Sequence, residues 1–478
     1  MNSALDAAGE LAIRSLIQRA PLASSLADAF KTAGFHLALV GGPVRDAILG
    51  RLGNDLDFTT NAPPTVTKKI LSGWAENVWD TGIAFGTVAG KRGDTTVEVT
   101  TYRSERYQSD SRKPGVVYGD SIEVDLSRRD FTVNAMALEL TKGAPIFIDP
   151  FNGLDDLAEK LLRTPSSAQE SFSDDPLRMM RAVRFASQLD FEVAEDVLTA
   201  MNDMAARLSI ISHERIRDEF IKILMSSNPR IGITMLVDTG LAEFVLPDIQ
   251  KLRLEIDEHH HHKDVYEHSL TVLEQAIAQE EKLGGPNLVI RLASLLHDIG
   301  KPKTRVHLKE GGVSFHHHEI VGARLAKERL RTLRFDGETI DEVETLIALH
   351  LRFHGYGDGY WTDSAVRRYV RDAGPLLIHL HVLTRADCTT RNKRKADALA
   401  ATYLSLEERI ALLMEQEELS KIRPDLDGAQ VMQILNIKPS SNVGKALDFL
   451  LELRLENGPL GEAKATEELL KWWSSTPS

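Results

Sequence analysis

The first residues whose type and spacing suggest chemistry are Asp55 and Asp57, in the segment DLDFT at 55–59. The segment alternates polar and apolar residues, which predicts a β-strand, and residues two apart on a strand point to the same face. Two carboxylates on one face can hold the same Mg²⁺ ions, as two-metal phosphoryl transfer requires. An isolated Asp-x-Asp is more often a loop cap or a solvated pair, so a metal-binding role is indicated only when neighbouring motifs support it. Glu98, in the strand-like segment VEVTT, is a candidate third carboxylate.

A glycine pair, Gly41 and Gly42, separates a strand expected at 36–40 from a helix that starts near Pro43 and carries Arg45. Glycines let a phosphate approach the backbone, and a helix N-terminus offers N–H donors and a favourable dipole. The pattern alone also fits an ordinary strand-to-helix turn. Combined with the two aspartates, it predicts a site for a nucleoside triphosphate.

Adjacent arginines, Arg128 and Arg129, precede a helix expected over Phe131–Met136, with Asp130 as its N-cap. Arginines at this place could face a triphosphate, since guanidinium groups bind phosphate oxygens well. A basic surface turn with a helix cap is the alternative interpretation.

A second set of arginines, Arg178, Arg181 and Arg184, recurs every three residues along a helix expected over Leu177–Leu189. Asp175 precedes this helix, so that a carboxylate and the Arg178 guanidinium lie one turn apart. Together they offer an acceptor and donors to the Watson–Crick edge of a base, which could select C or A without a template. The alternative is an intrahelical ion pair, which is worth only about 0.3–0.5 kcal/mol.

The second half of the chain contains six residues of metal-binding type in separate helical segments: His268, His297, Asp298, His318, His350 and Asp387. Imidazoles combined with carboxylates suit Mn, Fe, Ni, Zn or Mg. The sharpest signal is LLHDIGK at 295–301, which predicts a His-Asp pair at the end of an apolar helix capped by Gly300. A lone histidine is usually structural, but the ordered set predicts metal binding. The run His259–His262 is interpreted as a charged lead-in to a helix rather than a metal tract.

The elements that must position these residues form an α+β head followed by helices. Strands are expected at 36–40, 55–59, 85–89, 96–101 and 146–149, with helices at 44–49 and 64–74. From about Asn152 onward the apolar spacing is helical almost throughout. The expected organisation is an N-terminal helical segment (1–35), a catalytic head (36–150), a helical neck (151–254), a metal-binding body (255–400) and a helical tail (401–478).

Length and composition agree with a multidomain enzyme, because 478 residues exceed a single ordinary core. The net charge of −13 argues mildly against nucleic acid as partner, but basic runs at 128–129, 178–184 and 391–395 weaken that objection. The single cysteine, Cys388, excludes an internal disulfide framework. No membrane segment or signal peptide is expected, so the sequence predicts a cytoplasmic protein.

Motifs in the first half resemble, in the family's order, the class II tRNA nucleotidyltransferases, the bacterial CCA-adding enzymes: LVGGPVRDAILGR, DLDFTT, FGTV, VEVTTYRSERY, RRDFTVNAMAL, DPFNGLDDL and SFSDDPLRMMRAVRFA. These enzymes, like bacterial poly(A) polymerases, have a DNA polymerase beta-like nucleotidyltransferase head. The resemblance implies that Asp55 and Asp57 bind catalytic Mg²⁺. It also assigns contacts with the incoming CTP or ATP to Gly42, Arg45 and Arg128, and base reading to Asp175 and Arg178 assisted by Arg181 and Arg184.

One departure from the family's pattern is Asp174, which stands where Glu is usual; the base-reading residue itself is unchanged. The segment Ser104–Tyr118 corresponds to the family's flexible loop, which helps to switch specificity from C to A.

The second half, with HKDVYEHSLTVLEQ, LLHDIGKP and VSFHHHEIVGA, resembles the HD superfamily of metal-dependent phosphohydrolases, in the form found in actinobacterial-type CCA nucleotidyltransferases. The resemblance makes His268, His297, Asp298 and Asp387 the core ligands. It makes His318 and His350 an additional pair that allows two metals. A phosphohydrolase acting on phosphomonoesters or cyclic phosphates and an HD fold kept as a tRNA-binding body both remain open.

The sequence therefore predicts template-independent addition of C, C and A to tRNA, which would be recognised by the shape of its helix. A poly(A) polymerase and a CC-adding enzyme of the same family are the rivals. An HD phosphohydrolase with a nucleotide-sensing head and a non-catalytic RNA-binding protein are less favoured, because the residues for catalysis are intact. Oligomeric state is left open.

Overall fold

The computed structural model describes residues 2–80, 82–83, 86–103, 119, 121–254, 264–309, 313–353, 356, 361–390, 392–417 and 422–475. The expected specificity loop Ser104–Tyr118 and the histidine run His259–His262 lie outside this part of the chain. Two compact units divide the chain, Met1–Val245 and Leu246–Ser478.

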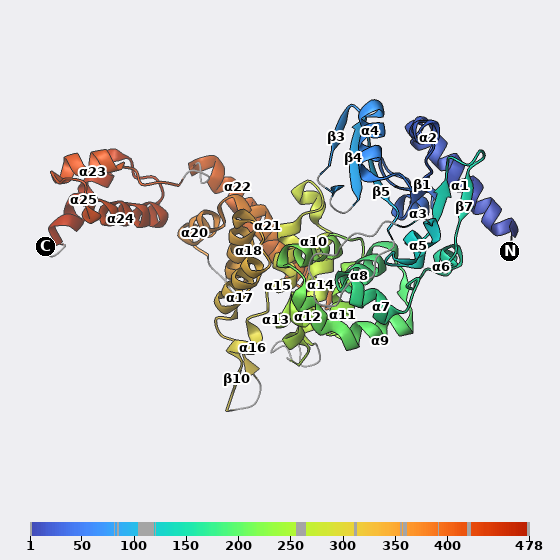
Figure 1. Cartoon of the computed structure of the whole chain (residues 1–478). Coiled ribbons are helices and arrows are strands. Elements are labelled where there is room, and N and C mark those ends of the chain that lie inside the picture. The colour runs from blue at the N-terminus through green and yellow to red at the C-terminus, as the bar shows by residue number, and fades with distance from the viewer. Residues whose placement is uncertain are drawn as a thin grey trace. The chain divides into compact units, whose positions relative to one another are not determined.

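The first unit contains a seven-stranded sheet in the order β3-β4-β5-β2-β1-β6-β7 (Figure 1). Among the described strands of this sheet, β2 and β5 alone pair in parallel and the other neighbours are antiparallel, so the predicted mixed sheet is confirmed. The strands are β1 (Leu37–Val40), β2 (Asp55–Thr60), β3 (Asn77–Trp79), β4 (Thr87–Arg92), β5 (Thr95–Thr101), β6 (Ala137–Glu139) and β7 (Ile146–Ile148). Helices α1 (Asn2–Arg19), α2 (Leu22–Thr32), α3 (Gly42–Ile48) and α4 (Pro64–Trp74) accompany the sheet.

The prediction of a helix over Phe131–Met136 is wrong. Residues Thr132–Asn134 form a single 3₁₀ turn, and the chain then enters β6, where Ala137 pairs with Val40 of β1. The local apolar pattern fits a helix, but pairing with the already buried strand β1 wins, because it satisfies the backbone groups of β6 inside the core.

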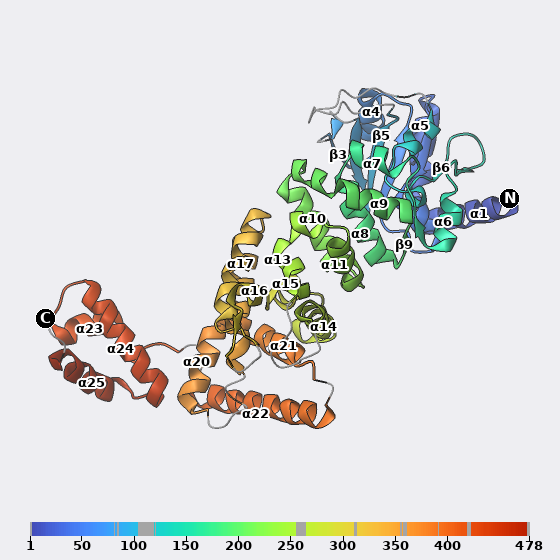
Figure 2. The ribbon, with the colours of Figure 1, turned by 90° about the horizontal axis from the view of Figure 1, so that it is seen from below.

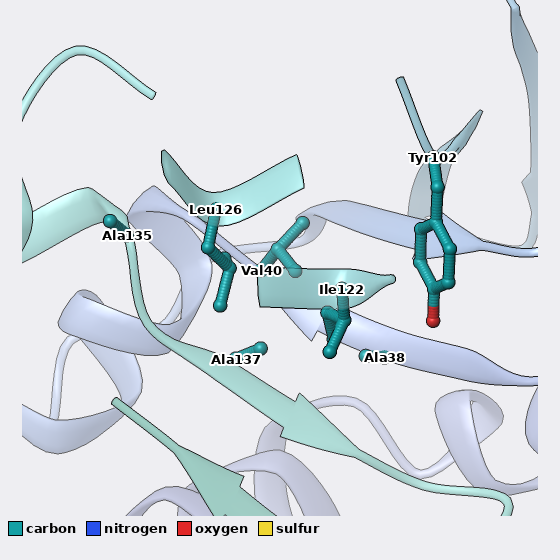
Figure 3. Close-up of a cluster of buried hydrophobic side chains, with 7 residues drawn as sticks. All are labelled: Ala38, Val40, Tyr102, Ile122, Leu126, Ala135 and Ala137. Carbon is teal, nitrogen blue, oxygen red and sulfur yellow. The ribbon is translucent and has the colours of Figure 1, made fainter. Parts of the chain in front are cut away.

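A cluster of small and apolar side chains fixes α5 (Ile122–Ser127) against the sheet, as Figure 3 shows. It consists of Ala38, Val40, Tyr102, Ile122, Leu126, Ala135 and Ala137, all buried. Because α5 ends immediately before Arg128 and Arg129, this packing determines where the two arginines stand.

The remainder of the first unit is helical, with α6 (Gly153–Glu159), α7 (Ala168–Asp174), α8 (Leu177–Leu189), α9 (Glu195–Met204), α10 (His213–Leu224), α11 (Pro229–Asp238) and α12 (Ala242–Val245). Helix α8 has the predicted bounds, and Met179, Met180 and Val183 are fully buried on its core side. Of its arginines, Arg178 and Arg181 are partly exposed, whereas Arg184 is buried.

The second unit is built from α13 (Pro247–Lys251), α14 (Val265–Ile277), α15 (Leu288–Leu296), α16 (Lys301–Thr304), α17 (His318–Thr332), α18 (Gly337–Leu349), α20 (Asp363–Ala373), α21 (Leu377–Asp387) and α22 (Lys393–Glu417). A hairpin of β10 (Val306–His307) and β11 (Val313–Ser314) follows α16. The boundary expected at 400 falls inside the continuous helix α22 (Figure 2).

The expected helical tail contains α23 (Gly428–Leu435), α24 (Ser441–Asn457) and α25 (Glu462–Ser475), which share an apolar cluster. None of the helices described has the length and apolarity to cross a membrane.

Candidate functional site

The two β2 aspartates lie on the same side of the strand, since Asp55 and Asp57 are exposed and Leu56 between them is buried. In the parallel register Asp57 is opposite Glu98 of β5. Burial raises the pKa of Asp57; Arg129 opposes this shift, while Glu98 and Asp55 add to it. Asp57 thus keeps contact with solvent although protein atoms crowd its carboxylate. Such crowding of negative charge is the environment that a divalent cation relieves.

The carboxylates of the head are not drawn together as tightly as the ligands in the second unit. Among the described residues, two groups of three have all their candidate ligand atoms within 4.8 Å of one another, and both lie in the helical body. Asp55, Asp57 and Glu98 do not form such a group. The head carboxylates still fit Mg²⁺ in type, because this ion takes one or two carboxylates and keeps waters and substrate oxygens as its other ligands.

The glycine turn lies directly under Arg129. Gly41 has φ of +74°, a conformation that favours glycine, and a Cβ atom there would stand 2.7 Å from Nη1 of Arg129. Helix α3 begins at Gly42 with Pro43 in its first turn, as predicted. Arg129 also lies 3.5 Å (Nη2) from Oδ2 of Asp125 and lowers the pKa of Asp57. The turn, one arginine and the β2 carboxylates therefore meet at one place.

A chain of hydrogen bonds connects the turn to α8. Arg45 Nη1 donates to Asn134 Oδ1 (2.7 Å), Asn134 Nδ2 donates to Asp130 Oδ1 (3.0 Å), and Arg181 Nε donates to Asp130 Oδ2 (2.8 Å). Burial alone would raise the pKa of Asp130, but the charge of Arg181 and the bond from Asn134 lower it to about 2. Sequence reasoning found Arg45, Asp130 and Arg181 but missed Asn134, whose only signal is its position inside the RRDFTVNA motif.

Arg128 and Arg178 meet through the backbone. Arg178 Nη2 donates to the carbonyl oxygen of Arg128, and its Nη1 donates to Oγ of Ser171 at 2.8 Å. The Nε and Nη1 atoms of Arg128 are buried without a hydrogen-bond partner among the described residues. Buried guanidinium donors are rarely left unsatisfied, so Arg128 is suited to receive an anion.

Asp175, expected to read the base, and Arg184, expected to assist, make separate contacts. Asp175 accepts a bond from Arg215 Nη2 of α10 at 3.0 Å, a partner that sequence reasoning missed. Arg184 forms a buried ion pair with Glu219 at 3.0 Å and lies over the Phe185 ring, 4.4 Å from its centroid.

In the second unit the structure brings all six expected ligands together from different helices. Two triads each have their ligand atoms within 4.8 Å: His268, His297 and Asp387, and Asp298, His318 and His350. The triads touch, since His297 Nε2 is 3.3 Å and His268 Nε2 is 3.7 Å from Oδ2 of Asp298, whose Oδ1 lies 3.2 Å from His318 Nε2 within its own triad. Asp298 therefore faces histidines of both triads.

Backbone carbonyls orient three of the imidazoles. Nδ1 of His297, His318 and His350 lies 2.9, 2.8 and 2.6 Å from a carbonyl oxygen three residues earlier. A carbonyl can only accept, so each Nδ1 carries hydrogen and each Nε2 is left for a metal. The Nε2 atom of His350 is buried without a hydrogen-bond partner among the described residues, which a metal would satisfy.

The pKa values of several residues in this cluster are strongly shifted. Burial lowers the pKa of His297, but Asp298 and Asp387 outweigh it and raise the pKa to about 10. Burial and the neighbouring His297 lower the pKa of His350 to about 3. Lys301 Nζ, 2.9 Å from Asp298 Oδ2, helps to hold that carboxylate ionised.

Gly300 does not cap α15 as expected: the C-cap of α15 is His297, and Gly300, with φ of −76°, precedes α16. Its role is close packing: a Cβ atom would stand 2.1 Å from the carbonyl oxygen of His318. This contact places the start of α17 against the His297-Asp298 pair.

Family models match three parts of the chain. The poly A polymerase head domain matches residues 37–163, the probable RNA and SrmB-binding site of polymerase A matches 190–252, and the HD domain matches 265–392.

Curated relatives agree with these models. The A-adding tRNA nucleotidyltransferase of Deinococcus radiodurans is 32% identical over 451 residues, which are 92% of this chain and 96% of that protein. The CCA-adding enzyme of Streptococcus sanguinis is 42% identical over 228 residues, 48% of this chain and 55% of that protein. The chain thus spans about half the length of the streptococcal relative.

Solved structures show the same fold. The Bacillus stearothermophilus CCA-adding enzyme in complex with CTP aligns with a TM-score of 0.67 at 23% identity, covering 96% of this chain and 98% of that one. The Thermotoga maritima CCA-adding enzyme complexed with tRNA aligns with a TM-score of 0.60 at 19% identity, covering 96% and 98%. The expected α+β head followed by a helical HD body is confirmed. With a relative aligned over nearly its whole length, the chain belongs to the tRNA nucleotidyltransferase family.

Proposed function

We propose that this protein adds C, C and A in order to the 3′ end of tRNA, using CTP and ATP. The observation that carries the proposal is the meeting of three features in the head: the β2 carboxylates Asp55 and Asp57, the Gly41-Gly42 turn, and Arg129 above that turn. The carboxylates hold metal, the glycine turn lets a triphosphate approach the backbone, and Arg129 neutralises phosphate charge.

In the transfer step, the 3′-hydroxyl oxygen of tRNA forms a bond to the α-phosphorus of the nucleotide. The bond from that phosphorus to the α,β-bridging oxygen breaks, pyrophosphate leaves, and the hydroxyl proton passes to solvent. Arg128 and Arg129 bind the triphosphate, while Gly41, Gly42 and Arg45 shape the turn under it. Asp55 and Asp57, with Glu98 beside them, would hold Mg²⁺, which supplies Lewis-acid stabilisation of the attacking oxygen and the triphosphate.

Selection of C and A follows from the pair Asp175 and Arg178. Cytosine and adenine each offer an amino donor beside a ring-nitrogen acceptor, whereas uracil and guanine reverse this order. A carboxylate that accepts and a guanidinium that donates therefore match C and A. Arg181 and Arg184 hold α8 in place through Asp130 and Glu219.

The HD cluster is proposed to bind one or two divalent ions, Mn, Fe, Ni, Zn or Mg, through its six ligands. Bound metal would supply a hydroxide able to attack phosphomonoesters or cyclic phosphates. The arrangement of two touching triads favours this over a purely tRNA-binding body. We place the enzyme in the cytoplasm with its tRNA. We propose the five-part division at 35, 150, 254 and 400 as a functional description, in which residue 400 lies inside the continuous helix α22.

A second candidate is addition of the terminal A alone, because the Deinococcus relative named A-adding aligns with 92% of this chain. One experiment separates the possibilities. The protein is incubated with tRNA lacking CCA and with tRNA ending in CC, each with CTP, ATP or both, and the product ends are sequenced.

Ordered C, C, A addition to the shorter tRNA supports the proposal. Extension only of tRNA ending in CC, and only with ATP, identifies an A-adding enzyme. A stop after two C residues identifies a CC-adding enzyme, and a long A tail from ATP alone identifies a poly(A) polymerase.

A further inference from the structure

Asp175 lies in the short connection between α7 and α8 and has an extended backbone conformation, with φ of −141° and ψ of 101°. Both of its carboxylate oxygens accept hydrogen bonds from the protein. Oδ1 accepts from the backbone N–H of Leu177 at 3.1 Å, and Oδ2 accepts from Nη2 of Arg215 at 3.0 Å. The carboxylate is therefore held by one backbone donor two residues further along the chain and by one side-chain donor from a separate helix.

Arg215 reaches Asp175 from the first turn of α10, whose N-cap is Ser212. Its side chain is 52% exposed and that of Asp175 is 27% exposed, so the contact is open to solvent and is not part of the packed core. The buried residues of α10 are Ile216, Glu219, Phe220, Ile223 and Leu224. Arg215 can thus be changed without opening a cavity.

The contact has a chemical consequence for base selection. Arginine is always protonated, and a backbone N–H can only donate, so both oxygens of Asp175 face donors. The group that meets the incoming base is consequently an acceptor, fixed in direction, with a remaining lone pair on each oxygen.

We infer that Arg215 is a specificity-positioning residue, which holds Asp175 as an oriented hydrogen-bond acceptor and thereby excludes UTP and GTP. This inference rests on the proposed function of the head. Arg215 need not touch the nucleotide, because it acts through Asp175. Without it, Oδ2 loses its donor, and the carboxylate is free to turn away from the direction in which it meets the amino group of cytosine or adenine.

The test measures kcat/KM for CTP and for UTP on tRNA lacking CCA, and Kd for both nucleotides without tRNA. Wild type is compared with Arg215→Ala, Arg215→Lys and Arg217→Ala. Arg217 lies two residues further along the same helix and pairs with Asp218, so its variant removes the same charge without touching Asp175. Circular dichroism and melting temperature report on folding.

In Arg215→Ala the CTP-to-UTP ratio of kcat/KM is expected to fall about three- to tenfold, as suits a partly exposed charged contact. The change should appear mainly in KM and in the ratio of Kd values. Arg215→Lys should recover part of the ratio, and Arg217→Ala should match wild type.

An unchanged CTP-to-UTP ratio in Arg215→Ala overturns the inference. So does an equal loss with every nucleotide, which would mark Arg215 as merely structural. If wild type adds no nucleotide at all, the proposed function fails, but the Kd ratios still decide whether Arg215 governs the choice of base.

Discussion

Asp57 on β2 lies directly opposite Glu98 on β5 in the parallel pairing of these strands. The negative charge of Glu98 raises the pKa of Asp57, and Asp55 on the same strand adds to the effect. A third carboxylate at this register is thus electrostatically coupled to the two β2 aspartates, the proposed catalytic pair, although sequence alone left its part in the site insecure.

Replacing Glu98 by Gln is expected to reduce nucleotide addition by about 10- to 100-fold and to raise the Mg²⁺ concentration needed for half-maximal rate. The cause is the loss of one negative charge beside the metal-binding pair. The check is a Mg²⁺ titration of the addition rate. Asp94→Asn, an exposed carboxylate in the turn between β4 and β5, serves as control. A wild-type Mg²⁺ curve for Glu98→Gln would remove Glu98 from the site.

The bond between Asp130 and Arg181 should make the stability of the first unit depend on acid pH. The pKa of Asp130 is lowered to about 2 in the folded protein, against about 3.9 in an unfolded chain. A lowered pKa means that the carboxylate stabilises the fold fully above about pH 4, by about 2 kcal/mol, and loses this as pH falls through 2.

The measurement is the melting temperature of wild type and Asp130→Asn between pH 7 and pH 2.5. The difference should be largest near neutrality and should shrink steadily below pH 4. A gap that stays constant over this range would mean that Asp130 is not ionised in the folded protein.

Metal uptake by the HD cluster should release protons. In the metal-free protein His297 is protonated at pH 7, because its pKa is about 10. A metal needs the neutral imidazole, so the bound proton must leave and affinity should rise with pH across the neutral range. Calorimetric titration with Mn²⁺ in buffers of different ionisation enthalpy measures the protons released.

Substitutions in the same cluster test the assigned metal ligands. His297→Ala should lose bound metal, measured by elemental analysis, while nucleotide addition continues, since the head residues are untouched. His307→Ala, at an exposed position in β10, should keep the metal. Full metal content in His297→Ala would contradict the assigned ligand set.

Local patterns were sufficient for much of this architecture. The alternation in DLDFT predicted that Asp55 and Asp57 share a face, and α4 and α8 have the bounds that the sequence indicated. The helix expected over Phe131–Met136 failed, because strand pairing with β1 overrides a helical pattern that is only six residues long.

Partners that arrive from distant segments could not be predicted. Asn134 meets Arg45 across 89 positions, and Arg215 meets Asp175 across 40. Nothing in the spacing of these residues indicates the contact, because folding alone brings them together. Likewise, Gly300 looked like a helix cap, and only the close approach of α17 reveals why its missing side chain matters.

The central claim is that the β2 carboxylates drive nucleotide addition, and its most direct measurement is the single-turnover rate of C addition to tRNA lacking CCA. Asp55→Ala and Asp57→Ala should each lower this rate by on the order of 10³-fold, with unchanged melting temperature and unchanged metal content in the HD cluster. Asp94→Ala should react as wild type does. If either β2 variant added C at a rate close to that of wild type, the carboxylates could not be the catalytic centre.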